Sequence, residues 1–590
     1  MSSLNEYFSK QFKFGNITKQ TAAFVVFAVL NLCLILIEWA RRVDSLVGLS
    51  DEGYLYTQLL SSQNTDDTAA LFSKILGAPF GWLDASVFNY RVFGLLLIVA
   101  SAVYTYISIR KILRKGGFQG GSNQVAITCG IAILLIPSTF RYLLMSPGYQ
   151  WLIAISSVIA FVIFLKLFQE KRLNPQGFVI FAICLVIVLQ VSLHTRLTFF
   201  LLMVLIIFIS LPLVQKNYLG LYICVVAGAL LIFALTQTYL FSAWRVTILN
   251  ARSVDPKGYS VLNELVDVSA SVGLVLTTIF LGSRLFSQFR DKNLFSFRFF
   301  IYATLSIALL IIWLIVSRDR LAPFVFACTL LLGKILPSQL RTYTKQMRVF
   351  YLVFLSFLPI TSQFGSNTPA LSNSNLVFIT LAFLLVVLML DSGSNLKTLV
   401  GTLSLILALI ACMQILNGFR SFETSNDHSG QVIMFEEELR TSKDISKEIN
   451  LFKIKFQEAE IPKTEKIADL SLFHPAAGLY LNHEVLPVGT ADKSFRGTFA
   501  DQLKILMRMY PKHFDGKFGL VLISLPGKDD WEAKGCLELE KWLLHQGQGE
   551  IDFNSEFLKN KYRALSTMKS TTSQESLFPN SISVLGKCRN

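Results

Sequence analysis

Apolar runs about 20 residues long recur along most of this sequence, from near residue 21 to near residue 417. A helix of about 20 residues spans the hydrocarbon core of a bilayer, where only helices and closed barrels satisfy their backbone groups. Charged residues make up 16% of the chain, against about 25% in a typical soluble protein. These features predict a polytopic all-α membrane protein, and they exclude a soluble enzyme and a disordered or fibrous chain.

We predict about thirteen membrane-spanning helices, which together with their loops form a membrane domain over residues 1–417. The first run leads directly into Glu38, Arg41 and Arg42 without a small-residue cleavage site, so it is expected to stay as an anchor. The runs lie near residues 21–40, 90–109, 124–140, 149–168, 177–193, 197–214, 219–241, 266–286, 299–317, 321–336, 349–361, 376–390 and 398–417.

The net charge of +15 lies in the membrane part, because basic and acidic residues nearly balance after Gly418. Basic residues gather in the N-terminal segment and in the loops after the second, fourth, eighth and tenth runs, which all fall on one side of the membrane. The positive-inside rule assigns this side to the cytoplasm. An odd number of spans then places the chain after Gly418 outside, and the charge needs no nucleic-acid partner.

The longest outer loop of the membrane part, residues 41–89, carries two adjacent carboxylates, Asp51 and Glu52. They could be solvated loop residues that cap a short helix. They could also supply a general base or a divalent-ion ligand at the membrane surface. The rest of the loop mixes apolar and polar residues, as short interfacial helices do.

Basic side chains also stand at the outer ends of the spans, where the positive-inside rule disfavours them. Single members could snorkel to lipid head groups or pair with nearby acids. Together they predict a basic ring suited to the phosphate or diphosphate of a lipid-linked substrate. The ring comprises Arg141, His194, Arg196, Arg245, Arg252, Lys257, Arg318 and Arg320. Carboxylates facing such a ring suit a group transfer in which a phosphate departs.

The motif Asp51-Glu52-Gly53-Tyr54, directly after an N-terminal span, resembles the first outer loop of the GT-C superfamily of membrane glycosyltransferases. These enzymes use polyprenyl-phosphate-linked sugars such as undecaprenyl phosphate derivatives. Two stretches resemble a bacterial cell-envelope branch of the superfamily: FGSN at residues 364–367, and DLS at 469–471 followed by residues 475–480. The SPGY stretch at residues 146–149 is similar to this branch as well.

The resemblance implies an inverting displacement in which Asp51 accepts the proton of the acceptor hydroxyl. Glu52 would orient the acceptor or, together with Asp51, hold a divalent cation such as Mg²⁺ or Mn²⁺; the sequence leaves this choice open. The expected ligands of the donor phosphate are Arg196, Arg318, Arg320, His194, Arg141, and, from a longer loop that could close over the donor, Arg245 and Lys257. The residues expected to contact substrate are Tyr54, Tyr149, Ser366 and Asn367.

Residues 418–590 are predicted to form a separate α/β domain on the outer, periplasmic side. Residues 431–460 are expected to be mostly helical, residues 520–525 to form a strand, and residues 499–510 and 531–545 to form helices. Cys536 and Cys588 are the cysteines of this part. In an oxidising compartment they are expected to form a disulfide.

The resemblance therefore implies a glycosyltransferase of the bacterial inner membrane in a cell-envelope polysaccharide pathway, and the loop charges predict that its site faces outward. The sugar, whether hexosyl or pentosyl, and the acceptor, whether glycan, lipid or protein, stay open. A lipid-linked glycan polymerase and a transporter or flippase of lipid-linked sugars are the alternatives. The polymerase would place its site in two large central outer loops, and the transporter would show repeated halves and ionisable residues deep within its helices.

Overall fold

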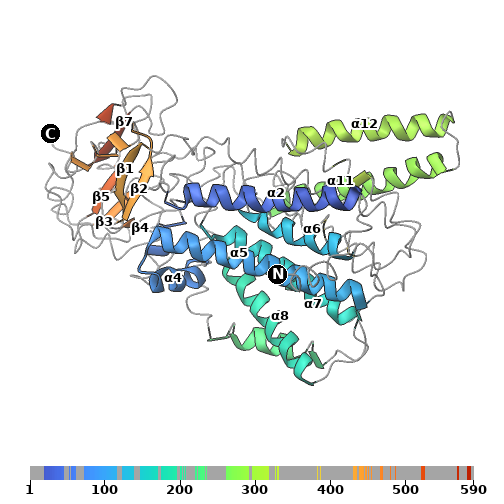
Figure 1. Cartoon of the computed structure of the whole chain (residues 1–590), viewed down its shortest axis with the longest axis horizontal. Helices are drawn as coiled ribbons and strands as arrows, with labels where there is room; N and C mark the ends of the chain where they lie inside the picture. Colours follow the sequence, from blue (N-terminus) through green and yellow to red (C-terminus); the bar gives the residue numbers. More distant parts are fainter. Residues whose placement is uncertain are drawn as a thin grey trace, which may run out of the picture.

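The computed structural model describes residues 19–44, 72–115, 122–138, 146–169, 175–195, 261–290, 296–317, 429–434 and 437–443 as continuous stretches. It also describes shorter pieces within residues 52–60, 199–235, 326–386 and 446–585. The longer described helices lie side by side, and the strands gather at one end of them (Figure 1). Each structural statement below concerns these residues.

Four of the described helices are long and apolar enough to cross a membrane: α2 (Lys19–Arg42), α5 (Val87–Lys115), α7 (Tyr149–Gln169) and α8 (Pro175–Thr195). Shorter apolar helical segments accompany them, among them those in α6 (Ser122–Leu134), α11 (Val261–Arg290) and α12 (Phe297–Ser317). The predicted helical, multi-pass membrane part is confirmed for these segments. The remaining predicted spans lie largely or wholly outside the described residues.

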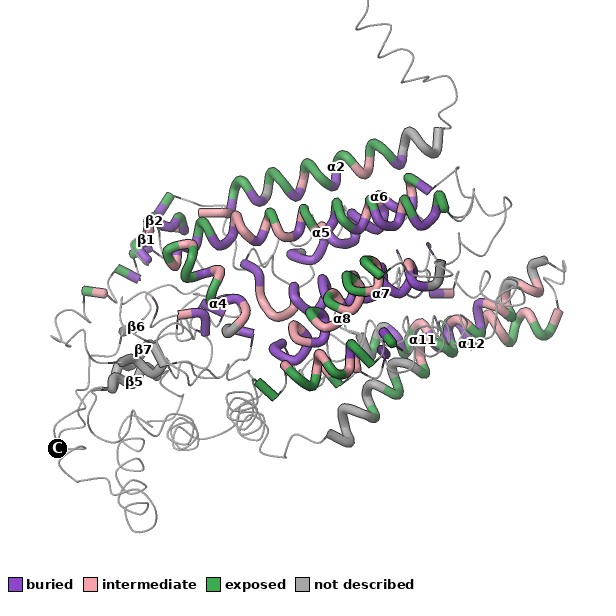
Figure 2. Tube along the Cα trace, turned by 90° about the horizontal axis from the view of Figure 1, so that it is seen from below, coloured by how far each residue is buried: buried purple, intermediate pink, exposed green. Residues whose placement is uncertain are grey.

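Helix α7 lies at the centre of the described bundle, since 78% of the residues in its most apolar stretch, within Tyr149–Leu167, are buried. It packs against α5 and α8, while α5 packs against α6 and α6 against α2. Trp151, Phe161 and Phe164 on α7 are fully buried in this core. Exposed residues recur along α2, α11 and α12, and many of them are apolar (Figure 2). An apolar surface of this kind suits contact with lipid.

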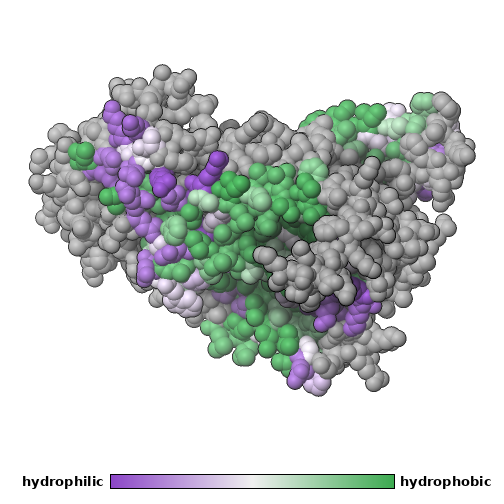
Figure 3. All heavy atoms as spheres, in the orientation of Figure 1, coloured by the Kyte–Doolittle hydropathy of each residue, from purple (hydrophilic) through white to green (hydrophobic). Residues whose placement is uncertain are grey.

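The surface view supports the same interpretation. Hydrophobic side chains cover the flanks of the helices, and hydrophilic ones lie at their ends, most of them at the end that carries α4 and the strands (Figure 3). Exposed side chains on the flanks include Val26 and Val29 of α2, Leu96 of α5, and Ile307 of α12.

Two helix boundaries differ from the predicted ones for clear reasons. Helix α5 continues past residue 109 to Lys115, because the basic residues that follow the membrane segment, Arg114 and Lys115 among them, favour the negative end of the helix dipole. The predicted helix over residues 124–140 ends at Leu134, and a 3₁₀ turn follows over Ile136–Ser138. Pro137 explains this end, since the residue before a proline disfavours α geometry.

The first outer loop contains helix α4 (Phe72–Trp82) and short helical pieces at residues 52, 55–56 and 58–60. This agrees with the short helices expected there. Helix α4 contacts α8. Because only five residues separate α7 from α8, the two run antiparallel, and the C-terminal end of α8 returns to the end of the bundle where α7 begins.

The tail forms strands. An antiparallel hairpin joins β1 (Gly430–Met434) to β2 (Glu437–Thr441). A second sheet has the order β4-β3-β5-β7-β6, from β3 (Lys466–Asp469), β4 (Val485–Leu486), β5 (Leu520–Ser524), β6 (Met568–Lys569) and β7 (Ser581–Leu585). The strand expected near residues 520–525 is confirmed. Strands β3 and β5 are parallel neighbours, a pairing that requires a crossover connection.

The expectation of a mostly helical segment over residues 431–460 was wrong at its start. Val432 and Met434 are buried while Gln431 and Ile433 are exposed, and Leu439 and Thr441 are buried on β2. This period of two is that of a half-buried strand. The absence of a side chain at Gly430 allows the backbone of β1 to approach Ser442, because a Cβ at this position would lie 2.5 Å from the carbonyl oxygen of Ser442.

Candidate active site at the outer end of the helices

A buried ion pair joins the first outer loop to α5. The guanidinium of Arg91 donates from Nε to Glu52 Oε1 at 3.2 Å and from Nη2 to Glu52 Oε2 at 2.9 Å. The side chains of Arg91 and Glu52 are 1% and 9% exposed. Paired geometry with two parallel hydrogen bonds is what a buried charge requires, since an unpaired charge at this depth is costly.

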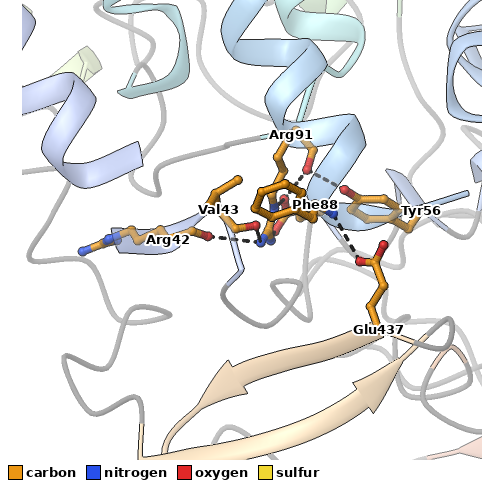
Figure 4. Close-up of polar contacts among 8 residues, drawn as sticks. Arg42, Val43, Tyr56, Phe88, Arg91 and Glu437 are labelled. Atoms are coloured by element: carbon orange, nitrogen blue, oxygen red, sulfur yellow. Dashed lines mark hydrogen bonds and ion pairs between the residues drawn. The ribbon is translucent and has the colours of Figure 1, made fainter. Parts of the chain in front are cut away.

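The same guanidinium also holds the end of α2. Arg91 Nη1 donates to the carbonyl oxygens of Arg42 at 3.2 Å and Val43 at 3.1 Å. Carbonyls at the C-terminal end of a helix lack intrahelical partners, and an arginine is well suited to satisfy them. Arg91 therefore fixes three parts of the chain together: α2, α5 and the loop segment at Glu52 (Figure 4).

Two motifs that lie about a hundred residues apart in the sequence meet here. The Ser146 hydroxyl donates a short hydrogen bond to Glu52 Oε1. Its oxygen also lies 2.9 Å from the Tyr56 hydroxyl. Ser146 begins the SPGY stretch, and Glu52 belongs to the motif at residues 51–54. The structure thus brings together the first-loop motif and the stretch that precedes α7.

An aromatic cluster packs beside these polar groups. The ring centroids of Tyr56, Phe80 and Tyr90 lie 5.2 to 6.0 Å apart in edge-to-face arrangements. The Tyr90 hydroxyl donates to the carbonyl oxygen of Pro147 at 2.9 Å. Burial raises the pKa of the Tyr56 hydroxyl above its ordinary value of 10.0. Tyr56 is therefore a neutral donor throughout the physiological range.

The first turn of α5 is capped from two places in the chain. Ser86 precedes the helix; its hydroxyl accepts from the Asn89 amide at 3.0 Å, and its carbonyl from the Tyr90 amide at 3.0 Å. Glu437 of the hairpin accepts the two remaining amides through Oε2, Val87 at 3.0 Å and Phe88 at 3.2 Å. Four amides at a helix N-terminus lack partners within the helix backbone. Here the tail supplies the partner for two of them.

Strand β2 also contacts the end of α2. The Arg440 amide donates to the Asp44 carbonyl oxygen at 2.8 Å, and Arg440 Nε lies 3.0 Å from Asp44 Oδ2. The hairpin is therefore at the same end of the bundle as the first loop. The thirteen predicted spans place twelve, an even number, between the two segments, which agrees with this placement.

Three of the predicted site residues lie among the described ones. Glu52 is buried in the pair with Arg91. His194 is buried near the C-terminal end of α8, and its Nδ1 lies 2.8 Å from the Gln190 carbonyl oxygen. Tyr149 begins α7 and packs against Phe72 with ring centroids 5.6 Å apart; its hydroxyl accepts a hydrogen bond from the side-chain Nε2 of Gln150. All three lie at the end of the bundle that carries the first loop.

The other predicted site residues lie outside the described residues, and their roles stay predictions. They are Asp51, Tyr54, Arg141, Arg196, Arg245, Arg252, Lys257, Arg318, Arg320, Ser366 and Asn367. The cysteines of the predicted disulfide, Cys536 and Cys588, also lie outside them. Within the described ranges, no three His, Cys, Asp or Glu side chains gather in a group that could hold a metal ion.

Sequence reasoning missed Arg91 and Glu437. A signal for Arg91 existed, because a single arginine one turn inside an apolar span calls for a buried partner, and Glu52 is an acid in the preceding loop. Glu437 carried no such signal. It stands in an acidic run in the tail, and its contact with α5 joins residues 350 positions apart.

No protein-family model matches the sequence, and no curated protein matches it either. Two crystal structures of ArnT from Cupriavidus metallidurans are similar to the structure. The apo chain gives a TM-score of 0.40 at 13% sequence identity, covering 96% of this chain and 98% of that one. The chain bound to undecaprenyl phosphate gives 0.41 at 14% identity, covering 95% and 97%.

Proposed function

We propose that the protein is a membrane glycosyltransferase that transfers a sugar from a polyprenyl-phosphate-linked donor to a hydroxyl group on the outer side of the membrane. The observation that carries the proposal is the meeting of the 51–54 motif with the SPGY stretch around the buried Glu52–Arg91 pair. This pair anchors the loop segment that contains Asp51 at the outer ends of the helices. A lipid-linked donor would present its sugar at that level.

The buried ion pair suggests different roles for the two adjacent carboxylates, Asp51 and Glu52. Glu52 accepts hydrogen bonds from Arg91 and Ser146, and charge-assisted bonds of this kind hold a carboxylate in a fixed position. A group held in this way suits a positioning role. We therefore assign positioning to Glu52 and proton transfer to Asp51.

In the proposed reaction, the acceptor oxygen forms a bond to the anomeric carbon as the bond from that carbon to the phosphate oxygen breaks. Asp51 takes the hydroxyl proton, and the polyprenyl phosphate leaves with the bonding electron pair. Displacement in one step inverts the anomeric centre. Arg196, Arg318 and Arg320 are proposed to stabilise the departing phosphate, with His194 nearby at the end of α8.

We place the reaction on the periplasmic side of a bacterial inner membrane, with the N-terminus in the cytoplasm and residues 418–590 outside. The loop charges support this orientation. The position of the hairpin beside the first loop also fits it, because both then lie on the same face.

The test is transfer by purified full-length protein, given an undecaprenyl-phosphate-linked sugar and an extracted glycan acceptor. Asp51→Asn removes the base and keeps the side-chain shape, so kcat should fall by roughly 10²- to 10⁴-fold. Asp84→Asn is the matched control. Asp84 is exposed in the same loop with a φ of 58°, a conformation that asparagine tolerates well. Full activity of the Asp51→Asn protein would exclude Asp51 as the base.

A second arm tests the cations separately from the base. The triple variant Arg196→Ala, Arg318→Ala, Arg320→Ala should weaken binding of undecaprenyl phosphate, because the anionic head group loses its charged partners. Asp51→Asn should leave this binding unchanged. Equal affinity of the wild-type and triple-variant proteins for undecaprenyl phosphate would refute the basic ring.

A further inference from the structure

Strand β2 of the tail hairpin touches the two membrane helices that flank the first outer loop. Glu437, at the start of β2, binds the first two amides of α5. Arg440, three residues later, binds Asp44 just after the end of α2. The strand therefore spans the two points at which the chain enters and leaves the loop that contains Asp51 and Glu52.

The contact at Glu437 bears on Arg91 through helix geometry. Val87 and Arg91 are four residues apart, so they lie one turn apart on the same face of α5. The first turn of a helix frays when its amides lack partners. Ser86 accepts hydrogen bonds from the amides of Asn89 and Tyr90. The Val87 and Phe88 amides instead donate to the carboxylate of Glu437. Loss of that carboxylate would loosen the turn on which Arg91 sits.

We propose that the β1–β2 hairpin is a positioning element of the transfer site, with Glu437 as its positioning residue. Glu437 fixes the first turn of α5, this turn fixes Arg91, and Arg91 holds Glu52 beside the proposed base Asp51. The inference rests on the proposed function for its catalytic consequence. The mechanical link from Glu437 to Glu52 rests on the hydrogen bonds of Glu437 with α5 and of Arg91 with Glu52.

The electrostatics favour a carboxylate at this position. Amides at a helix N-terminus carry the positive end of the helix dipole, and an acid there makes charge-assisted hydrogen bonds. Both Glu437 bonds use the same oxygen, Oε2. A glutamine can present one carbonyl oxygen in the same place, although without the charge. Glu437→Gln should therefore behave between the wild type and Glu437→Ala.

The chain offers a matched control in the neighbouring residue. Glu438 has the same side chain on the same strand, and it is exposed. Glu438→Ala removes an equal charge without touching α5. Exposed charges contribute little, so this variant should stay within about twofold of wild type.

Two measurements on full-length protein in detergent or nanodiscs test the proposal. In hydrogen exchange, Glu437→Ala should speed exchange of the amides of residues 87–91 by about five- to tenfold, the usual weight of a helix cap, and should also speed exchange around residue 52. In transfer assays, Glu437→Ala should lower kcat by roughly 10- to 100-fold with a nearly unchanged KM for the donor. Small displacements of catalytic groups have effects of this size.

The outcomes distinguish the positioning of α5 by Glu437 from the effect of this positioning on sugar transfer. Unchanged exchange at residues 87–91 and 52 in Glu437→Ala would overturn the positioning role, whatever the activity. Faster exchange with unchanged kcat would overturn its catalytic consequence. If the wild-type protein transfers no sugar, the proposed function fails, while the exchange result still decides the role of Glu437. If Glu437→Ala does not fold, Glu437→Gln and Glu438→Ala give the same comparison.

Discussion

Removal of the Arg91 guanidinium should be among the most damaging single changes in the described part of the protein. Arg91 makes four hydrogen bonds, two to Glu52 and one each to the carbonyls of Arg42 and Val43. Arg91→Met keeps much of the apolar stem but leaves the Glu52 carboxylate buried without its cation. Breaking a buried ion pair from one side costs about 3–5 kcal/mol.

A double-mutant cycle tests this reasoning more sharply than one variant. Glu52→Leu alone leaves a buried guanidinium, so it should also be costly. The double variant Arg91→Met, Glu52→Leu removes both charges, and replacement of a buried pair by apolar groups is often nearly neutral. It should therefore cost less than the sum of the single changes, with a coupling of about 2 kcal/mol or more, although the α2 carbonyls still lose their donor.

The assay is reversible unfolding of the purified protein in mixed micelles of increasing SDS content, followed by tryptophan fluorescence. Arg91→Lys belongs in the series, because a lysine cannot reproduce the planar fork and should recover only part of the loss. Additive costs in the double variant would show that Arg91 and Glu52 do not stabilise each other. A single-variant cost of less than about 1 kcal/mol for Arg91→Met would refute the burial argument itself.

Two further predictions follow from the structure and the loop charges. Burial raises the Tyr56 pKa above its ordinary value of 10.0, so the folded state keeps a proton that the unfolded state loses; stability should therefore fall as pH rises above about 10. Tyr56→Phe should lessen this fall, as alkaline unfolding curves can show, and an unchanged slope would contradict it. Reporter fusions at Lys115 and Asn590 should report cytoplasm and exterior respectively, and a cytoplasmic signal at Asn590 would overturn the outward site.

Features that depend on residues close together in the sequence could be predicted, whereas features that depend on contacts between distant segments could not. Apolar runs depend on neighbouring residues and on the bilayer, so the start of α7 at Tyr149 was predicted correctly. The segment after Gln431 was misassigned, because its acidic and basic residues suggested a charged helix. The alternation of Val432 and Met434 with exposed neighbours becomes visible as a strand only once β2 pairs with it.

In the candidate site, too, some residues could be identified from the sequence and others could not. The Asp51-Glu52 pair stands out in the sequence because two carboxylates follow a span directly. Glu52 turned out to be held by Arg91, which a closer look at ionisable residues within spans would have identified. Glu437 could not have been predicted, since its partners are backbone amides, and backbone amides leave no trace in the residue types of α5.

The cap at the start of α5 has a consequence for the order in which a newly made chain matures. Glu437 follows the last predicted span, so the ribosome synthesises it after all the membrane helices, and it reaches α5 only from the face where the first loop lies. The contacts that hold the first turn of α5 therefore stay incomplete until β2 has been synthesised and has reached this end of the bundle. A chain that stalls or is cleaved before β2 would lack the Glu437 cap, and the helix turn that carries Arg91 would be free to fray.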